Sequence, residues 1–336
     1  MFNELLPSLL FIQIPSAIFV YFDSRKRKMV DPWLWIIGVA FFMPLFLPFY
    51  ILLRPRTAYL YCPNCNAKNP FPISNCESCG LQIQSQEKLR QAEWGLLDSI
   101  TILILSLFII PVSLAGLSSL LGILEGDWSE WNNIYYFSLI GSASLIILSL
   151  WFIKKVCGRP LKDIGLTKEN ILRNILIGII LVAPVLFLEY VAEEAIIKIG
   201  EIIAPSQAEH LRELQDMEHR GSIDIWPKSM NEYTRLIGVA LLVIILGPLG
   251  EEILFRGMFY TSLRRRHERL ASLILSSIFF AFVHGQFIHL FPIFLIAIIL
   301  AYLYERTGSI ISSITLHISV NLFFVIILYY YPNLYT

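Results

Sequence analysis

Charged side chains are scarce in this chain, and their scarcity argues against a soluble fold. Asp, Glu, Lys and Arg together make up 15% of the 336 residues, whereas 56% of the residues are hydrophobic. A soluble domain of this length would be more polar. Neither sign of charge dominates, because 26 basic side chains balance 26 acidic ones, so the chain has no global field that would attract nucleic acid. Composition therefore predicts a membrane protein without a nucleic-acid partner.

Long apolar runs explain this composition. A hydrocarbon core of about 30 Å is crossed by about 20 apolar residues in a helix. Runs near that length predict an all-α, polytopic transmembrane bundle of about eight or nine helices. We expect N-terminal membrane segments within 1–58 and the main bundle within 95–330. The expected helices cover approximately 5–22, 33–53, 96–122, 134–153, 171–190, 236–257, 271–288, 290–304 and 309–330.

Basic residues in short loops predict how the bundle is oriented. Basic clusters at 154–159 and 264–269, together with Arg306, fall on one side if the last seven helices cross alternately. The positive-inside rule makes that side the cytoplasm, which indicates the cytoplasmic membrane and places 60–95 on its inner side. The acidic loop 123–133 fits the outside. The basic run 25–28 conflicts with this rule, and prolines in the second apolar run allow a kinked or re-entrant segment, so the topology of 1–58 stays open.

Only five cysteines are present, and four of them form two close pairs. Cys62 and Cys65 make one CxxC, Cys76 and Cys79 make the other, and ten residues separate the pairs. Four thiolates at this spacing suit tetrahedral zinc, and a segment this small would take most of its folding free energy from the metal. We therefore predict a closed, structural zinc ribbon over 59–82 that serves an unidentified partner. Two disulfides are the alternative, although the reducing side of the membrane and the strain of a CxxC disulfide favour zinc.

An acidic pair interrupts the apolar run that begins at Leu236. Glu251 and Glu252 are followed by Arg256 in the segment EEILFR. An ionised carboxylate deep in a bilayer costs roughly 2.5–3.5 kcal/mol, so such residues usually face a protein interior or a wet cavity and carry function. Counted at about 1.5 Å per helical residue, Glu251 lies about 20 Å from the basic boundary at Arg264.

Two other helices bring polar side chains to a similar depth. His284 lies about 22 Å from its boundary, and His317 and Asn321 lie about 16 and 22 Å from theirs. Glu252 and Arg256 are four residues apart and can pair on one helix face, which leaves Glu251, about 100° further round, for chemistry. This convergence predicts a built polar site within the membrane.

These residues carry a family resemblance. EEILFR, then Phe280-Ala-Phe-Val-His284, then His317-Ile-Ser-Val-Asn321 resemble the EExxxR, FxxxH and HxxxN series of the CPBP intramembrane proteases. That family includes the type II CAAX prenyl endopeptidases and the bacterial Abi and bacteriocin-processing proteins. The resemblance covers about residues 160–330, and the N-terminal helices and the zinc ribbon lie outside it.

The resemblance implies a glutamate-dependent endopeptidase that acts on a peptide or protein substrate, lipidated or not, among membrane lipids. Glu251 would be the general base that activates water, with His284 orienting it. His317 and Asn321 would stabilise the oxyanion, while Glu252 and Arg256 would support the site. Glu251, His284 and His317 could also form a catalytic zinc site with an open position, since the family is often labelled metalloprotease. We favour metal-independent chemistry and leave the metal open.

The motifs of other intramembrane protease classes are missing. The chain has no HExxH and no GxSG, and its one Gly-Asp, at Gly126 and Asp127, lies in a polar loop. Non-enzymatic interpretations compete as well. A membrane histidine is often only a packing residue, and a Glu with an Arg one turn later is often only an ion pair. A transporter or proton relay, an immunity-type binding partner, and a protein whose principal function is the zinc ribbon are the alternatives. The sequence does not decide whether the substrate is a prenylated CAAX peptide, a bacteriocin or a signalling peptide.

Overall fold

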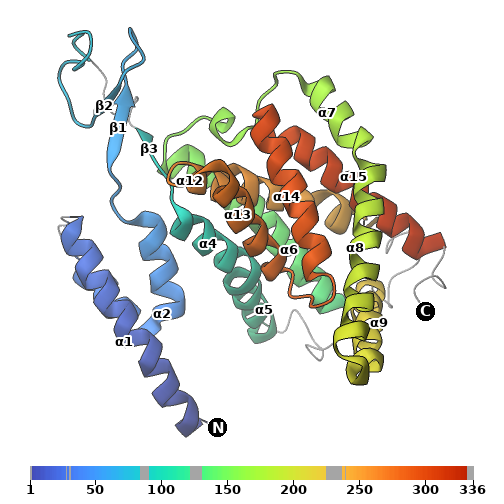
Figure 1. Cartoon of the computed structure of the whole chain (residues 1–336). Coiled ribbons are helices and arrows are strands. Elements are labelled where there is room, and N and C mark those ends of the chain that lie inside the picture. Colours follow the sequence, from blue (N-terminus) through green and yellow to red (C-terminus); the bar gives the residue numbers. More distant parts are fainter. Residues whose placement is uncertain are drawn as a thin grey trace. The chain divides into compact units, whose positions relative to one another are not determined.

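The structure is a computed structural model of the whole chain (Figure 1). It describes residues 2–27, 29, 32–83, 91–121, 131–224, 237–238 and 240–330, with side chains described for these residues except 2–11, 131–135, 219–224 and 328–330. The acidic loop predicted at 123–133 lies mostly outside the described residues. By internal contacts the chain divides into two units, Met1–Leu105 with Leu148–Pro160, and Ser106–Ile147 with Leu161–Thr336.

Helices dominate both units, and the predicted fold class is confirmed. Within the described residues, six helices are long and apolar enough to cross a membrane, and the chain is a polytopic α-helical membrane protein. They are Trp33–Leu53, Leu96–Leu120, Tyr136–Val156, Ile171–Ile203, Leu290–Thr307 and Ile310–Ile327.

The first unit contains a helical hairpin, α1 (Phe2–Lys26) and α2 (Trp33–Leu53). The Asp23 carboxylate joins the two helices, because its Oδ2 accepts hydrogen bonds from Tyr50 Oη at 2.8 Å and from Arg54 Nη1 at 3.1 Å. The backbone of α2 leaves helical geometry at Phe42, just before Pro44, whose ring clashes with the preceding turn. The kinked alternative for this segment is therefore present.

A small antiparallel sheet follows the hairpin in the same unit. Its strand order is β2-β1-β3, with β1 (Ala58–Tyr61) between β2 (Lys68–Pro70) and β3 (Gln91–Ala92). The helix α4 (Leu96–Ile104) begins four residues after β3. A buried ion pair between Arg56 Nη2 and Asp98 Oδ1, 2.7 Å apart, ties the start of β1 to α4.

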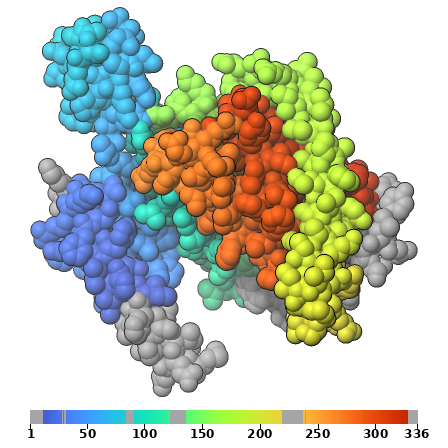
Figure 2. All heavy atoms as spheres, in the orientation of Figure 1, coloured from blue at the N-terminus to red at the C-terminus, as the bar shows by residue number. Residues whose placement is uncertain are grey.

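The second unit is a bundle whose core is apolar. Its C-terminal helices α13 (Arg269–Val283), α14 (Leu290–Thr307) and α15 (Ile310–Tyr330) pack in sequence, and α8 (Val182–Ile203) lies beside α14 (Figures 1 and 2). Buried side chains of α8, α14 and α15 form one cluster: Val185, Leu300, Leu303, Leu316 and Val320. Other α-helices among the described residues are α5 (Ile110–Leu120), α6 (Trp131–Trp151), α7 (Ile171–Ile180), α9 (Ala208–Asp224), α11 (Gly247–Glu251) and α12 (Thr261–Arg264).

Some helix boundaries differ from the prediction. The helix expected at 171–190 continues through α8 to Ile203, and this extension contains Glu193 and Glu194. The helix expected at 271–288 ends at Val283, because Gly285 takes a left-handed backbone with φ +67° that a helix cannot continue. The polar helix α9 follows α8, and residues 225–236 lie outside the described part of the chain.

Close packing of α7 on α15 depends on a glycine. A Cβ atom built at Gly178 would lie 2.8 Å from both Ser312 O and Thr315 Cβ. We expect Gly178→Ala to lower the free energy of unfolding by about 1–3 kcal/mol, because the helices would have to separate. Gly116→Ala is the matched control, since its Cβ would meet nothing within 4 Å and should stabilise the helix slightly. Thermal unfolding in detergent measures both, and equal midpoints for the two variants would contradict the packing argument.

Candidate active site

The acidic pair lies on an irregular helix. Residues 240–264 run without a break through a π-helical segment η5 (Ala240–Leu246), the short α11, a second π-helical segment η6 (Glu252–Tyr260) and α12. Pro248 has no N–H to continue the α-helical bonding. π-helical turns inside helices are frequent at functional sites, because the wider turn changes where side chains point. Glu251 ends α11 and Glu252 begins η6, so the change of helix type falls between the two carboxylates.

Glu252 and Arg256 form a buried ion pair, as their spacing predicts. Arg256 Nη1 lies 2.7 Å from Glu252 Oε1, and the two side chains are 3% and 0% exposed. Arg256 Nη2 also donates to Ala297 O of α14 at 3.3 Å, and the guanidinium lies 4.3 Å from the centroid of the Phe280 ring. A buried charge without a partner would cost several kcal/mol, roughly 3–5, so these contacts hold three helices in one arrangement.

His317 of α15 joins this ion pair. Its Nδ1 lies 3.0 Å from Glu252 Oε1, and its side chain is 11% exposed. An ionised carboxylate only accepts hydrogen bonds, so Nδ1 carries the proton. In the neutral ring, Nε2 is then an unprotonated acceptor. Glu252 therefore sets both the orientation and the tautomer of His317.

His284 is fixed in the same way by a backbone carbonyl. It caps the C-terminus of α13, and its Nδ1 lies 2.8 Å from Phe280 O. A carbonyl only accepts, so Nδ1 is again the donor and Nε2 carries the lone pair. The Phe280 ring packs 4.5 Å from the imidazole, centroid to centroid.

Glu251 lies between the two imidazoles. Its Oε2 is 3.9 Å from His284 Nε2 and 3.9 Å from His317 Nε2. Those distances are too long for direct hydrogen bonds, and Oε2 is buried with no hydrogen-bond partner among the described residues. Three acceptor atoms thus face one another across a small gap. A molecule that donates two protons, such as water, complements that arrangement.

Asn321 takes a different place from the other predicted site residues. Its Nδ2 donates to Val243 O in η5 at 2.9 Å, so this hydrogen bond connects α15 to the π-helical segment before Glu251. Phe280 is the residue that sequence reasoning left without a role. The signal was present, since Phe280 precedes His284 by one helical turn and its carbonyl is the natural partner for the capping histidine.

The spacing of these donors bears on the catalytic-zinc alternative. When nitrogen and oxygen ligands bind zinc tetrahedrally at about 2.1 Å from the metal, two ligand atoms lie roughly 3.4 Å from each other. Both Glu251 Oε2 to Nε2 separations are wider, at 3.9 Å. Among the described residues, the group of metal-ligating side chains that gathers closely enough is the four cysteines.

The four cysteines do come together, in two knuckles of the same design. In each knuckle the residue four after the first cysteine has a left-handed backbone, Asn66 in one and Gly80 in the other, and its N–H donates to the carbonyl of that cysteine at 2.9 Å. The sulfur atoms all lie within 4.8 Å of one another. Cys62 and Cys79 are 3.6 Å apart at sulfur, as are Cys65 and Cys76. Tetrahedral zinc–thiolate ligands would be about 3.8 Å apart, so the cluster has the size of a metal site.

The electrostatics of the cluster also suit a cation. The backbone N–H groups of Cys79 and Ser78 lower the pKa of the Cys76 thiol to about 6. The backbone N–H of Ala67 favours the Cys65 thiolate, but desolvation and the neighbouring sulfur atoms outweigh it and raise that pKa to about 12. Four crowded thiols cannot all ionise alone, and a divalent cation removes this conflict.

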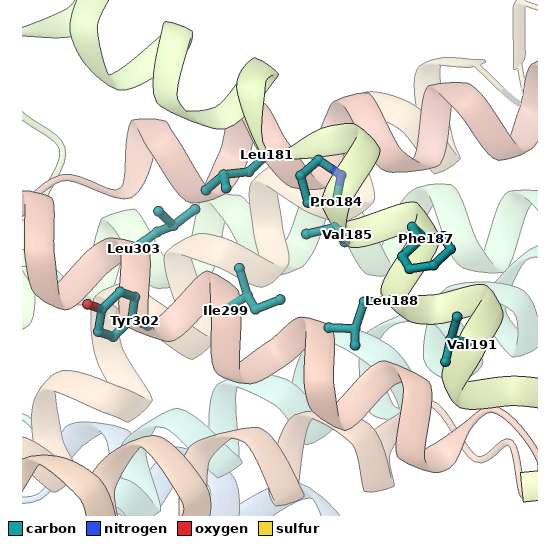
Figure 3. A pocket seen from close by; sticks show the side chains of 9 residues that line it. All are labelled: Leu181, Pro184, Val185, Phe187, Leu188, Val191, Ile299, Tyr302 and Leu303. Carbon is teal, nitrogen blue, oxygen red and sulfur yellow. The ribbon is translucent and has the colours of Figure 1, made fainter. Parts of the chain in front are cut away.

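An apolar pocket lies between α8 and α14 (Figure 3). It has a volume of about 480 Å³, and none of the predicted site residues lines it. Tyr302 supplies its one hydroxyl. The lining residues are Leu181, Pro184, Val185, Phe187, Leu188, Val191, Ile299, Tyr302 and Leu303.

Comparisons with known proteins point to the same part of the chain. Residues 233–323 match the family model of type II CAAX prenyl endopeptidases, Rce1-like. The chain is 35% identical over 80 residues to "UPF0177 protein YxdF" of Lactococcus lactis subsp. lactis (strain IL1403), a match that covers 24% of this chain and 44% of the relative. It is 34% identical over 91 residues to "Putative membrane peptidase YdiL" of Bacillus subtilis (strain 168), which covers 26% and 37%.

These matches are partial. The chain spans less than half the length of either curated relative. No solved structure matches the chain significantly. The matched segment nevertheless contains every residue of the polar site, from Glu251 to Asn321. Residues 233–323 are thus similar to the type II CAAX prenyl endopeptidases and carry the polar cluster of two glutamates, an arginine, two histidines and an asparagine.

Proposed function

We propose that the protein is a glutamate-dependent intramembrane endopeptidase. The observation that carries this proposal is the position of Glu251, whose Oε2 lies 3.9 Å from the Nε2 atoms of both His284 and His317. The Nδ1 atom of each ring already makes a hydrogen bond to another group, so the Nε2 atoms are the ones that face the glutamate. The similarity of residues 233–323 to a peptidase family supports it. A peptide or protein is the corresponding substrate.

The geometry suggests how water would be activated. A water molecule in the gap donates one hydrogen bond to Glu251 Oε2 and the other to His284 Nε2, so its lone pair faces the substrate. Glu251 takes a proton as the water oxygen bonds to the scissile carbonyl carbon. The carbon–nitrogen bond then breaks, and Glu251 returns the proton to the leaving nitrogen. The glutamate ends the cycle ionised, and the new carboxylic acid loses its proton to solvent.

The developing oxyanion needs donors, and two side chains of α15 are assigned this role. Asn321 Nδ2 has two N–H groups, and the hydrogen bond to Val243 O uses one of them. His317 donates from Nε2 only as an imidazolium, since its Nδ1 proton faces Glu252. In the resting arrangement, in which His317 Nε2 is an acceptor, the second N–H of Asn321 Nδ2 is the donor that we assign to the oxyanion.

Cleavage of a defined peptide panel by purified protein in detergent tests the proposal. The panel contains prenylated CAAX peptides, their unprenylated forms and unrelated hydrophobic peptides, because the apolar lining of the pocket does not distinguish a substrate's lipid chain from that of a membrane lipid. Mass spectrometry of the products, with and without a chelator, shows whether a peptide bond is cut. Cleavage by the wild-type protein that is lost in Glu251→Gln supports the proposal. Equal cleavage by both proteins, or proton flux through Glu251 without cleavage, overturns it.

We further propose that the cysteine cluster is a structural zinc ribbon on the cytoplasmic side of the cytoplasmic membrane. All four thiolates would saturate the metal, so the site has no open position for a substrate. We expect one equivalent of zinc in the purified protein, measured by elemental analysis, and a loss of most of it in Cys76→Ser. Cys157→Ser is the control. Because Cys157 lies outside the cluster, this variant protein should keep its zinc. Equal metal content in the two variants would contradict the assignment.

A further inference from the structure

The connection between α13 and α14 is anchored by a carboxylate from another helix. Glu218 of α9 accepts hydrogen bonds from the backbone N–H groups of Phe287 at 2.5 Å, Ile288 at 3.1 Å and His289 at 3.2 Å. The His289 ring adds a fourth contact, with Nδ1 2.6 Å from Glu218 Oε2. These residues directly precede α14. One side chain therefore accepts hydrogen bonds from three successive N–H groups of the segment that leads into α14, the last of them at its N-cap, His289.

His289 connects this anchor to α8 as well. Its Nε2 lies 3.6 Å from Glu193 Oε1, and Gln215 of α9 donates to the same oxygen at 2.7 Å. The side chains of His289, Glu218 and Glu193 are only 14%, 15% and 16% exposed. An ion pair on an open surface contributes little, whereas a mostly buried and multiply bonded carboxylate fixes geometry. Helices α8 and α9 and the connection thus form one polar junction.

The charge on Glu218 suits this position. Burial alone would raise the pKa of its carboxyl, but the hydrogen bonds from His289 and the backbone outweigh that effect, and the pKa lies below its ordinary value. The carboxyl is therefore ionised at neutral pH. Negative charge at a helix N-terminus also interacts favourably with the helix dipole.

The anchored connection begins at a residue of the proposed active site. His284 is the C-cap of α13, beyond the last helical residue, and the chain turns immediately afterwards at Gly285, whose φ is +67°. The Phe280 carbonyl holds one side of the His284 ring. The Glu218 junction holds the chain on the C-terminal side of His284, at residues 287–289. Release of that junction would let residues 285–289 pivot at the glycine and displace the histidine.

We propose that Glu218 is a positioning residue for the hydrolysis, which keeps His284 Nε2 facing Glu251 by fixing residues 287–289. This inference rests on the proposed endopeptidase function. The helices themselves do not need Glu218, because α13 and α14 pack directly on each other and Arg256 joins η6 to α14 independently. A displacement of about 1 Å at a catalytic group can lower a rate about 100-fold, so a small movement of the connection is enough.

Glu218→Gln tests the assignment, with Glu213→Gln as the matched control. Glutamine keeps the shape but places an amide donor against the backbone donors, whereas Glu213 lies on the same helix with its side chain 65% exposed. The two readouts are the kinetics of peptide cleavage and the NMR signals of histidine labelled with nitrogen-15. The chain has six histidines, few enough to assign by single substitutions.

The expected result is specific to positioning. In Glu218→Gln we expect kcat to fall about 10- to 100-fold with KM nearly unchanged. The melting temperature should fall too little to unfold the protein at the assay temperature, and the His284 signals should shift together with those of His289. Glu213→Gln should match the wild-type protein in both readouts. Glu218→Asp, which keeps the charge but shortens the side chain, applies the same test should the glutamine variant not fold.

Two results would overturn the inference. One is a His284 spectrum that stays unchanged while only His289 shifts. The other is a fall in melting temperature that accounts for the whole loss of activity. If the wild-type protein cleaves nothing, the proposed function fails, but the His284 signals still decide whether Glu218 positions that ring. The two failures are therefore distinguishable.

Discussion

Replacement of Glu251 by glutamine should lower peptide cleavage by about 10²- to 10⁴-fold, the usual contribution of a general base. Glutamine has nearly the same shape as glutamate, so the fold should persist. It cannot take a proton from water, and its amide can donate to the Nε2 acceptors of His284 and His317, which lie 3.9 Å from Glu251 Oε2. The variant should therefore close the gap in which we place the nucleophilic water. Initial cleavage rates of the best peptide in the panel measure the effect.

Two controls separate the loss of a general base from a general loss of carboxylate charge or of folding. Glu213→Gln removes an exposed carboxylate from α9 and should leave the rate unchanged. Thermal unfolding of Glu251→Gln should match that of the wild-type protein, because Glu251 Oε2 has no hydrogen-bond partner to lose among the described residues. A rate within about threefold of the wild type would be incompatible with a general base at this position.

Loss of the Arg256 guanidinium should produce the largest effect on stability. Arg256→Met leaves Glu252 as a buried carboxylate, 0% exposed, whose remaining partner among the described residues is His317 Nδ1. Removal of one partner from a buried pair typically costs about 3–5 kcal/mol. The same substitution also removes the hydrogen bond to Ala297 O and the contact with the Phe280 ring. The free energy of unfolding, measured by denaturant titration in detergent, should fall by that amount.

A matched pair of variants separates burial from charge. Arg212→Met breaks an ion pair to Glu201 in which the arginine is 62% exposed, and it should cost no more than about 1 kcal/mol. The double variant Glu252→Gln with Arg256→Met should be more stable than Arg256→Met alone, because it leaves no uncompensated charge in the interior. Equal losses in the buried and exposed single variants would contradict the structural role of the Glu252–Arg256 pair.

Much of the candidate site follows from spacing along helices. The four-residue interval between Glu252 and Arg256 and the common depth of Glu251, His284 and His317 needed only the rise and turn of a helix. The structure brings these side chains together. The two CxxC pairs are similarly local, since each knuckle is defined by five consecutive residues and only their approach to one another requires the fold.

Other features depend on contacts that spacing does not encode. The tautomer of His317 is set by Glu252, which lies 65 residues away in the chain. Asn321 faces a carbonyl in a π-helical turn, a geometry that apolar periodicity does not distinguish from an α-helix. Glu218 reaches residues about 70 positions later because α9 folds back along α8, and a glutamate on an amphipathic helix looks the same in sequence whether it faces solvent or a helix terminus.

A general base at Glu251 requires that the water molecule it activates attacks the peptide bond directly. A single turnover in oxygen-18 water, with wild-type protein in excess over the peptide and mass spectrometry of the N-terminal product, measures whether it does. Direct attack by water predicts one oxygen-18 atom in the new carboxylate from the first turnover onward. An unlabelled product in that first turnover would mean that a protein side chain, and not water, forms the new bond, and would contradict this mechanism.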